Sequence, residues 1–325
     1  MRKYVIVLIG TITGALSFTS CDHVENPFPV GISTDLDTNL YPGNWSDYVA
    51  NDWPDFSTLP NDNPNRNALI EDFTGHNCSN CPAAATVAHN LHEGNPSRVF
   101  VASVHAGPEI DGAGSFQDVN IAQGYTIDFV NQNGRDLGAF FGVTISGSGF
   151  NGNPSGTVSR TLLGTEYFYG SFIWSSQVNN VLGSSLSVAI KAKVNYFDAT
   201  KGLFLHTEIE KLDGALNYED LAQVVYLIED SLVGPQNVSS TFTPDYVHRD
   251  IMRGCIDGKT WGRDITDGTL VGGKYQLDYS YVVPNQLAPQ GQTGTHNAEN
   301  MHLLIYVYNK NTYEIYQVIK KKIVP

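Results

Sequence analysis

The chain has 325 residues, with 19 Lys+Arg against 33 Asp+Glu and a formal net charge of −14. This length is sufficient for about two domains, each with its own core. The acidic balance excludes nucleic acid as a partner, because binding phosphates needs clustered Lys and Arg, and the only basic run is residues 320–322. Four cysteines are too few for a disulfide scaffold of this size, so their placement matters more than their number.

The N-terminus predicts an export signal. Two basic residues precede an apolar stretch at 4–16 that is too short to span a membrane, and small and polar residues then lead to Cys21. This pattern resembles a bacterial lipoprotein signal, although Phe18 stands where Leu is usual. The resemblance implies that residues 1–20 are removed and that Cys21 carries the lipid anchor. The alternative is an ordinary secretory signal in which Cys21 is incidental.

Residues 21–65 predict a tether. Between 22 and 65 there are eight acidic residues, six prolines and no Lys or Arg, a composition that buries too little apolar surface to offset its chain entropy. Four aromatic residues in the later part provide a means of attaching it to a folded domain: Trp45, Tyr48, Trp53 and Phe56.

A Cys-x-x-Cys motif at Cys78 and Cys81 lies between a predicted strand from about residue 68 and an Ala-rich predicted helix, with a second apolar strand at 99–104. This order is typical of redox chemistry. We expect Cys78 at the helix N-terminus, where the macrodipole favours a thiolate that attacks, and Cys81, more buried, as the resolving thiol. Pro82 fits the first helical turn.

Two alternatives to redox chemistry stay open. His76 and His105 could complete a metal site with the two cysteines, although no second cysteine pair exists. The Cys78–Cys81 disulfide could instead be a purely structural bond. The sequence indicates no cofactor.

The segment around the motif resembles thioredoxin. Asp72 stands six positions before Cys78, where that family has a buried carboxylate that transfers protons to and from the resolving cysteine. Pro154 follows Asn153 where the family has a cis-proline, which implies a peptide groove beside the disulfide. Asn77 departs from the pattern by replacing the customary Trp. The alternative for Asp72 is a solvated carboxylate at a strand end, and for Pro154 an ordinary loop proline.

The second half of the chain predicts strands. Apolar and polar residues alternate near 186–195, 203–209 and 275–283, and no substantial helix is expected after Leu182. The fold class expected is therefore an α/β thioredoxin-like domain at 66–183 followed by an all-β antiparallel sandwich at 184–325. Cys255 is expected to be a buried structural thiol, and the many tyrosines to be strand residues that pack their rings.

The arrangement as a whole resembles the outer membrane protein 28-related family, surface-associated lipoproteins of Bacteroidetes. The motif stretches at 71–84, 227–230 and 313–318 carry this resemblance, which spans about 66–325. It implies a lipid-anchored outer-membrane protein at the cell surface or the periplasmic face.

Two functions follow from these observations. The first is thiol-disulfide exchange with protein or peptide thiols, by Cys78, Cys81, Asp72 and Pro154. The second is a surface binding protein that holds a surface ligand and in which the Cys-x-x-Cys pair is a structural disulfide. The residues favour the first slightly and leave the enzyme assignment open.

Overall fold

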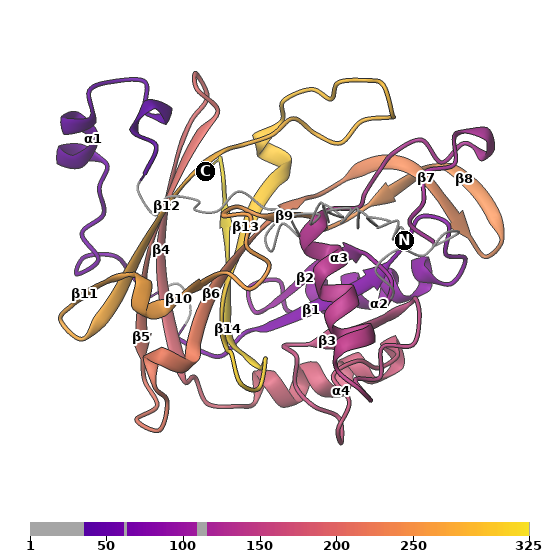
Figure 1. The fold of residues 1–325 in the computed structure, drawn as a ribbon, viewed down its shortest axis with the longest axis horizontal. Coiled ribbons are helices and arrows are strands. Elements are labelled where there is room, and N and C mark those ends of the chain that lie inside the picture. Colours follow the sequence, from indigo (N-terminus) through magenta and orange to yellow (C-terminus); the bar gives the residue numbers. More distant parts are fainter. Residues whose placement is uncertain (1–35, 62–63, 109–115, 325) are drawn as a thin grey trace, which may run out of the picture. The chain divides into compact units, whose positions relative to one another are not determined.

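A computed structural model describes residues 36–61, 64–108 and 116–324 of the protein (Figure 1). The predicted signal peptide and the lipidation site at Cys21 lie outside the described residues. No helix within these ranges has the length and apolar character needed to cross a membrane. The helices are α1 (Trp45–Asn51), α2 (Cys81–Gly94), α3 (Gln132–Ala139) and α4 (Ser171–Leu182), with short turns η1 (Thr38–Leu40), η2 (Ile121–Gln123), η3 (Phe140–Thr144), η4 (Tyr218–Asp220), η5 (Ile265–Asp267) and η6 (Ala298–Asn300).

The larger sheet joins strands from both halves of the chain. Its order is β14-β13-β6-β9-β2-β1-β3, with β10 paired to β6. The β1–β2 and β2–β9 pairs are parallel and the other pairs are antiparallel. The strands are β1 (Ala68–Thr74), β2 (Val99–His105), β3 (Ser155–Val158), β6 (Leu221–Glu229), β9 (Ile251–Cys255), β10 (Arg263–Asp264), β13 (Met301–Asn309) and β14 (Ile315–Lys322).

The boundary predicted between residues 183 and 184 does not divide this sheet. Strand β9 pairs with β6 on one side and, through Ser103 and Ile251, with β2 on the other. All described residues belong to one compact unit. The prediction of two separate domains is therefore wrong, because sequence periodicity indicates strands but not which distant strand each one pairs with.

A second sheet gives the C-terminal part its sandwich. It has the order β11-β12-β5-β4 and shares a hydrophobic core with β6, β13 and β14. The protein is mostly β-sheet, mixed in one layer and antiparallel in the other, and only 3-10 turns interrupt the strands after Leu182. The remaining strands are β4 (Val188–Phe197), β5 (Gly202–Lys211), β7 (Leu232–Val238), β8 (Thr241–His248), β11 (Thr269–Val271) and β12 (Lys274–Val282).

The described residues 36–61 are attached to the folded protein by aromatic residues, the alternative that the sequence left open for this segment. Tyr48 of α1 is fully buried, and its hydroxyl is 2.6 Å from Nε2 of His206 on β5. Phe56 is also buried, and its carbonyl accepts a hydrogen bond from Lys191 on β4. The aromatic side chains bury enough surface to hold this acidic segment against the second sheet.

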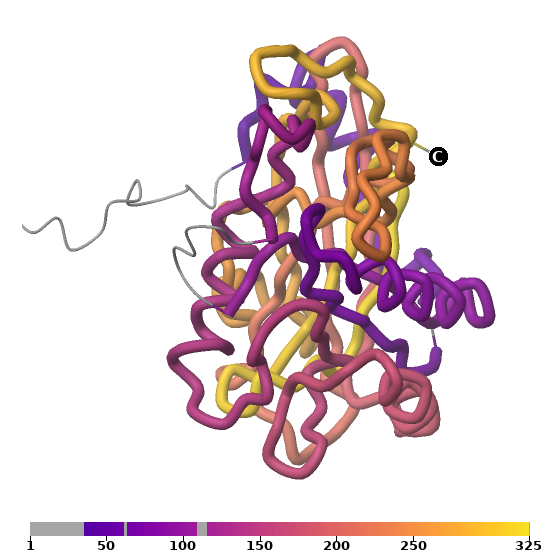
Figure 2. Tube along the Cα trace, turned by 90° about the vertical axis from the view of Figure 1, so that its right-hand side faces the viewer, coloured from indigo at the N-terminus to yellow at the C-terminus, as the bar shows by residue number. Residues whose placement is uncertain are grey.

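Helices α2 and α4 cover β1 and β2. They lie side by side in Figure 2 and share a core with the even-numbered residues of β1, including Ala68 and Ile70. The odd-numbered residues Leu69 and Phe73 point to the opposite core, together with residues of β6 and β13. Strand β1 is therefore buried on both faces. One face packs against the helices, and the other packs in the core that includes strands from the second half of the chain.

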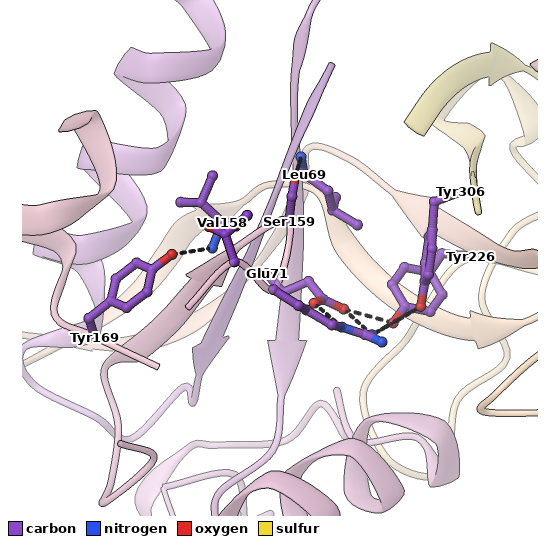
Figure 3. A network of polar contacts seen from close by, with 9 residues as sticks. Leu69, Glu71, Val158, Ser159, Tyr169, Tyr226 and Tyr306 are labelled. Carbon is purple, nitrogen blue, oxygen red and sulfur yellow. Dashed lines mark hydrogen bonds and ion pairs between the residues drawn. The ribbon is translucent and has the colours of Figure 1, made fainter. Parts of the chain in front are cut away.

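A buried ion pair lies in that opposite core. Arg160, which follows β3, donates to both oxygens of Glu71 on β1 at 2.7 and 2.8 Å. It also donates to the hydroxyls of Tyr226 on β6 and Tyr306 on β13. Figure 3 shows the side chains of Glu71, Tyr226 and Tyr306 converging. This network ties β1 to two strands from the second half of the chain.

Arg160→Met should destabilise the protein by about 3–5 kcal/mol, because it leaves the Glu71 carboxylate buried without its cation. The double variant Glu71→Leu/Arg160→Met should recover most of that loss, since no charge then remains buried. Urea unfolding measures both. Lys201→Met, which breaks an exposed pair with Asp198, serves as the control and should change little. A double variant as unstable as Arg160→Met would contradict the argument.

Candidate functional site

The two cysteines lie where β1 meets α2. They form a disulfide with an S–S distance of 2.06 Å. Helix α2 begins at Cys81, with Pro82 in its first turn, while Cys78 lies in the preceding turn. The prediction that Cys78 occupies the helix N-terminus is therefore wrong by three residues. Cys81 is the first residue of the helix, and its backbone N–H donates to the carbonyl of Cys78.

Both cysteines are buried, with exposed fractions of 2% for Cys78 and 1% for Cys81. The expected contrast between an accessible attacking thiol and a buried resolving thiol is absent from this structure. Substrate access to the sulfur atoms therefore needs a movement of whatever covers them.

Asp72 lies on the helix-covered face of β1, between Ile70 and Thr74. It is fully buried, and neither carboxylate oxygen has a hydrogen-bond partner. Burial raises the pKa of this carboxyl to about 7. Its neighbour across the sheet is Ser103 of β2, which lines a pocket together with Thr74 and Cys81. The interpretation of Asp72 as a solvated strand-end carboxylate is wrong.

Pro154 lies at the start of β3, and the Asn153–Pro154 peptide bond is cis, as expected. Strand β3 pairs antiparallel with β1, so that Phe73 faces Ser155 and Asp72 faces Gly156. On its other side Gly156 exchanges two backbone hydrogen bonds with Tyr169. The peptide-binding edge expected beside the cis-proline is thus partly occupied by the chain itself.

The hairpin of β7 and β8 covers the Cys78 loop, and sequence reasoning missed it. The side chain of Gln236 donates to the carbonyls of Gly75 and Cys78 at 3.3 and 3.1 Å. The backbone N–H of Asn237 donates to His76, and that of Ser239 donates to Ser79. The sequence signal for this hairpin is weak. Two short segments with some apolar residues flank Ser-Ser, but neither segment alternates apolar and polar residues clearly enough to predict a strand.

A pocket of about 220 Å³ lies between this hairpin, α2 and β2. Cys81 and Pro82 line it from α2, and His248 and Asp250 line it from the end of the hairpin. The polar residues 248–250 thus lie beside the disulfide. Burial raises the pKa of Asp250 to about 6.

Three buried histidines surround Phe129 next to this pocket. The rings of His105 and His248 lie 4.6 and 4.4 Å from that of Phe129, and the ring of His76 lies 5.6 Å from it. Burial lowers the pKa of His105 well below its usual value and that of His248 to about 4, so both are neutral at pH 7. In the part of the chain that the structure describes, no group of three or more His, Cys, Asp or Glu side chains is arranged to hold a metal ion.

Cys255 is a free buried thiol on β9, and burial raises its pKa well above the usual value. Its expected structural role agrees with this position inside the core. The tyrosines of the second half also behave as expected of packed strand residues. Tyr279, Tyr306 and Tyr308 are buried in the two large cores.

Asp72→Asn should be more stable than the wild type at pH 8 and equally stable near pH 4. The folded carboxyl keeps its proton up to about pH 7, whereas the unfolded one loses it above about pH 3.8. The wild type therefore loses stability as pH rises through this window, by roughly 4 kcal/mol in total, and the amide does not. Urea unfolding at pH 4, 6 and 8 measures the difference. A gain that is independent of pH would show that Asp72 is not the titrating group.

Together these observations describe a β-rich protein with a buried Cys-x-x-Cys disulfide at the junction of its mixed sheet and a covering helix. The chain belongs to the Omp28 family, because the family model for outer membrane protein Omp28 matches residues 144–325. The family resemblance found in the sequence is confirmed, and the protein is an outer membrane protein.

Among solved structures, the chain is similar to HBP35 of Porphyromonas gingivalis. The TM-score is 0.56 at 16% identity, covering 80% of this chain and 76% of that one. At this identity the likeness concerns the fold alone. A domain of the outer membrane lipoprotein Omp28 from Porphyromonas gingivalis also matches, with a TM-score of 0.28, 22% identity, and coverage of 42% of this chain and 88% of that one. No curated protein matches the chain.

Proposed function

We propose that this outer membrane protein carries out thiol-disulfide exchange through Cys78 and Cys81, in a thioredoxin-like arrangement of β1, α2, β2 and β3. The observation that carries the proposal is Asp72. A fully buried carboxyl without a hydrogen-bond partner is costly, and packing gives no reason for it. Its pKa of about 7 suits a group that exchanges protons at neutral pH.

The exchange step needs a thiol on the partner protein or peptide. The partner's thiolate attacks the sulfur of Cys78, forming a mixed disulfide and releasing Cys81 as a thiolate. Asp72 gives its proton to Cys81. A second partner thiolate then attacks the partner's sulfur, which frees the thiolate of Cys78. The partner is oxidised to a disulfide, and the Cys78–Cys81 pair is reduced to a dithiol.

The same steps in reverse oxidise the protein and reduce a partner disulfide. In that direction Cys78 attacks and Cys81 resolves, while Asp72 accepts the proton of Cys81. Pro154 directly precedes β3, whose first residue, Ser155, pairs with Phe73 near the end of β1. In this proposal Pro154 shapes the strand edge along which an extended peptide would lie.

A second function is favoured by the burial of both cysteines. In that case the protein binds a ligand at the cell surface, and the disulfide only stabilises the turn between β1 and α2. A disulfide that closes so short a loop constrains little of the unfolded chain, so its stabilising effect on the whole protein would be small.

Reduced Cys81→Ser should form a mixed disulfide with oxidised glutathione through Cys78, whereas reduced Cys78→Ser should form at least about tenfold less. Mass spectrometry of the peptides locates the adduct, and the buried Cys255 is an internal control that should stay unmodified. Asp72→Asn in the otherwise wild-type protein should slow release of the mixed disulfide. Equal, slow modification of both cysteine variants would favour the structural disulfide.

We also propose that Cys21 carries a lipid that anchors the protein in the outer membrane. Cys21→Ala should remove the acylation site, so that the protein leaves the membrane fraction. Cys255→Ala is the matched control and should stay with the membrane, because its thiol is buried in the fold. Unchanged fractionation of Cys21→Ala would contradict lipid anchoring.

A further inference from the structure

The hairpin over the disulfide is an excursion from the main sheet. Strands β7 and β8 pair only with each other, between β6 and β9, which are themselves neighbours in the sheet. Glu229 at the end of β6 faces Ile251 at the start of β9. The two ends of the hairpin therefore leave the sheet at one place, and a movement of the hairpin breaks no hydrogen bond between sheet strands.

Both ends have hinge geometry. Ser231 and Asp250 adopt left-handed backbone conformations, with φ of 59° and 51°. Few residues other than glycine adopt this conformation, and it costs free energy in each case. The side chain of Asp230 accepts from the backbone N–H groups of both residues, at 2.7 and 3.4 Å, and holds them together.

The hairpin tip is strained in the same way. Ser239 and Ser240 have φ of 49° and 68°, the geometry that a two-residue turn usually gives to Asn-Gly. Ser239 donates its backbone N–H to Ser79, which lies between the two cysteines. The strained turn is thus held where it contacts the Cys-x-x-Cys loop.

The hairpin contacts this loop mainly by polar groups. Five consecutive carbonyls of the loop, those of residues 75–79, accept hydrogen bonds from the hairpin. Beneath it the pocket of about 220 Å³ separates β8 from α2. The outer face is open, since Val233 and Val247 are 55% and 41% exposed. Apolar contacts also hold the hairpin: Leu232 near its base packs with Ile127 and Phe129, and the ring of Phe242 near its tip lies 5.4 Å from that of Tyr125. Opening costs these few contacts together with the hydrogen bonds to the loop.

We propose that the β7–β8 hairpin is a gate, in which the segment from Gln236 to Ser239 occupies the position of a partner peptide on the Cys-x-x-Cys loop. Opening about Ser231 and Asp250 exposes the disulfide and leaves the five carbonyls as acceptors. The partner that fits them is an extended peptide that donates backbone N–H groups in place of the hairpin. The inference deepens the proposed exchange function and rests on it for its biological meaning.

The test is the rate at which a water-soluble phosphine reduces the Cys78–Cys81 bond in the full-length, natively folded protein. Quenching with a maleimide and peptide mass spectrometry follow this bond alone. Gln236→Leu keeps the volume but removes the donors to Gly75 and Cys78, and should speed reduction about tenfold. Ser239→Gly/Ser240→Gly relieves the strained turn, stabilises the closed hairpin, and should slow reduction a few-fold.

Gln223→Leu is the matched control. Gln223 is a buried glutamine on β6, bonded to Thr207 and remote from the hairpin, so its loss should lower stability without speeding reduction. The kinetics of urea unfolding, extrapolated to water, give the global unfolding rate of each variant for comparison. Equal reduction rates in all variants, or rates that follow global unfolding, would overturn the gate.

Failure of the gate and failure of the exchange function are distinguishable. The phosphine needs no partner protein, so gated reduction without glutathione adducts on Cys81→Ser would keep the gate and reject the exchange. Glutathione adducts with ungated reduction would do the opposite.

Discussion

The pairing of Glu71 with Arg160 is the constraint on which the rest of the structure depends. Both side chains are almost completely removed from water, and a charge in that position needs an opposite charge and hydrogen bonds in place of its hydration. The two tyrosine hydroxyls of β6 and β13 supply part of this bonding. Aromatic rings, those of Phe141 and Tyr308 among them, lie within 6 Å of the guanidinium carbon. Arg160 bonds to Glu71, 89 positions before it, and to Tyr306, 146 positions after it, so the network requires both halves of the chain to form one core.

The ion pair places the two adjacent carboxyl groups of Glu71 and Asp72 in different environments. Strand side chains alternate, so Glu71 points into the core with Arg160 and Asp72 points under α2. Glu71 has a cation that binds it through two hydrogen bonds, one to each carboxylate oxygen, whereas Asp72 has no hydrogen-bond partner. The Glu71 carboxylate therefore stabilises the fold, whereas the Asp72 carboxyl can gain or lose its proton as the pH changes. A one-residue slip of β1 would exchange these roles, and the ion pair excludes that slip.

The sequence predicted the local features well. The strand before Cys78, the helix after it and the strand-rich second half follow from periodicity, which involves neighbours in the chain. The cis bond at Pro154 was implied by the resemblance to thioredoxin and is present. The domain boundary was wrong because it depends on β9 joining β2, a pairing between Ser103 and Ile251, which are 148 positions apart, and it has no local signal. The aromatic residues indicated that residues 36–61 could attach to the fold, but the attachment point, His206 for Tyr48, is equally distant in the sequence and could not be predicted.

The candidate site shows the same division. Asp72 and the two cysteines could be found from their spacing, but not the hairpin that covers them, because Gln236 reaches the loop from 158 residues away. Burial of a disulfide in one static structure does not by itself make that disulfide structural. What decides is the free energy needed to expose it. Here the cover is a two-stranded hairpin that has hydrogen bonds to the Cys-x-x-Cys loop, a few apolar contacts through Leu232 and Phe242, and left-handed residues at each end. A two-stranded hairpin is marginally stable by itself. Exposing the sulfur atoms therefore costs the contacts of one hairpin, while the sheet held by Glu71 and Arg160 stays intact.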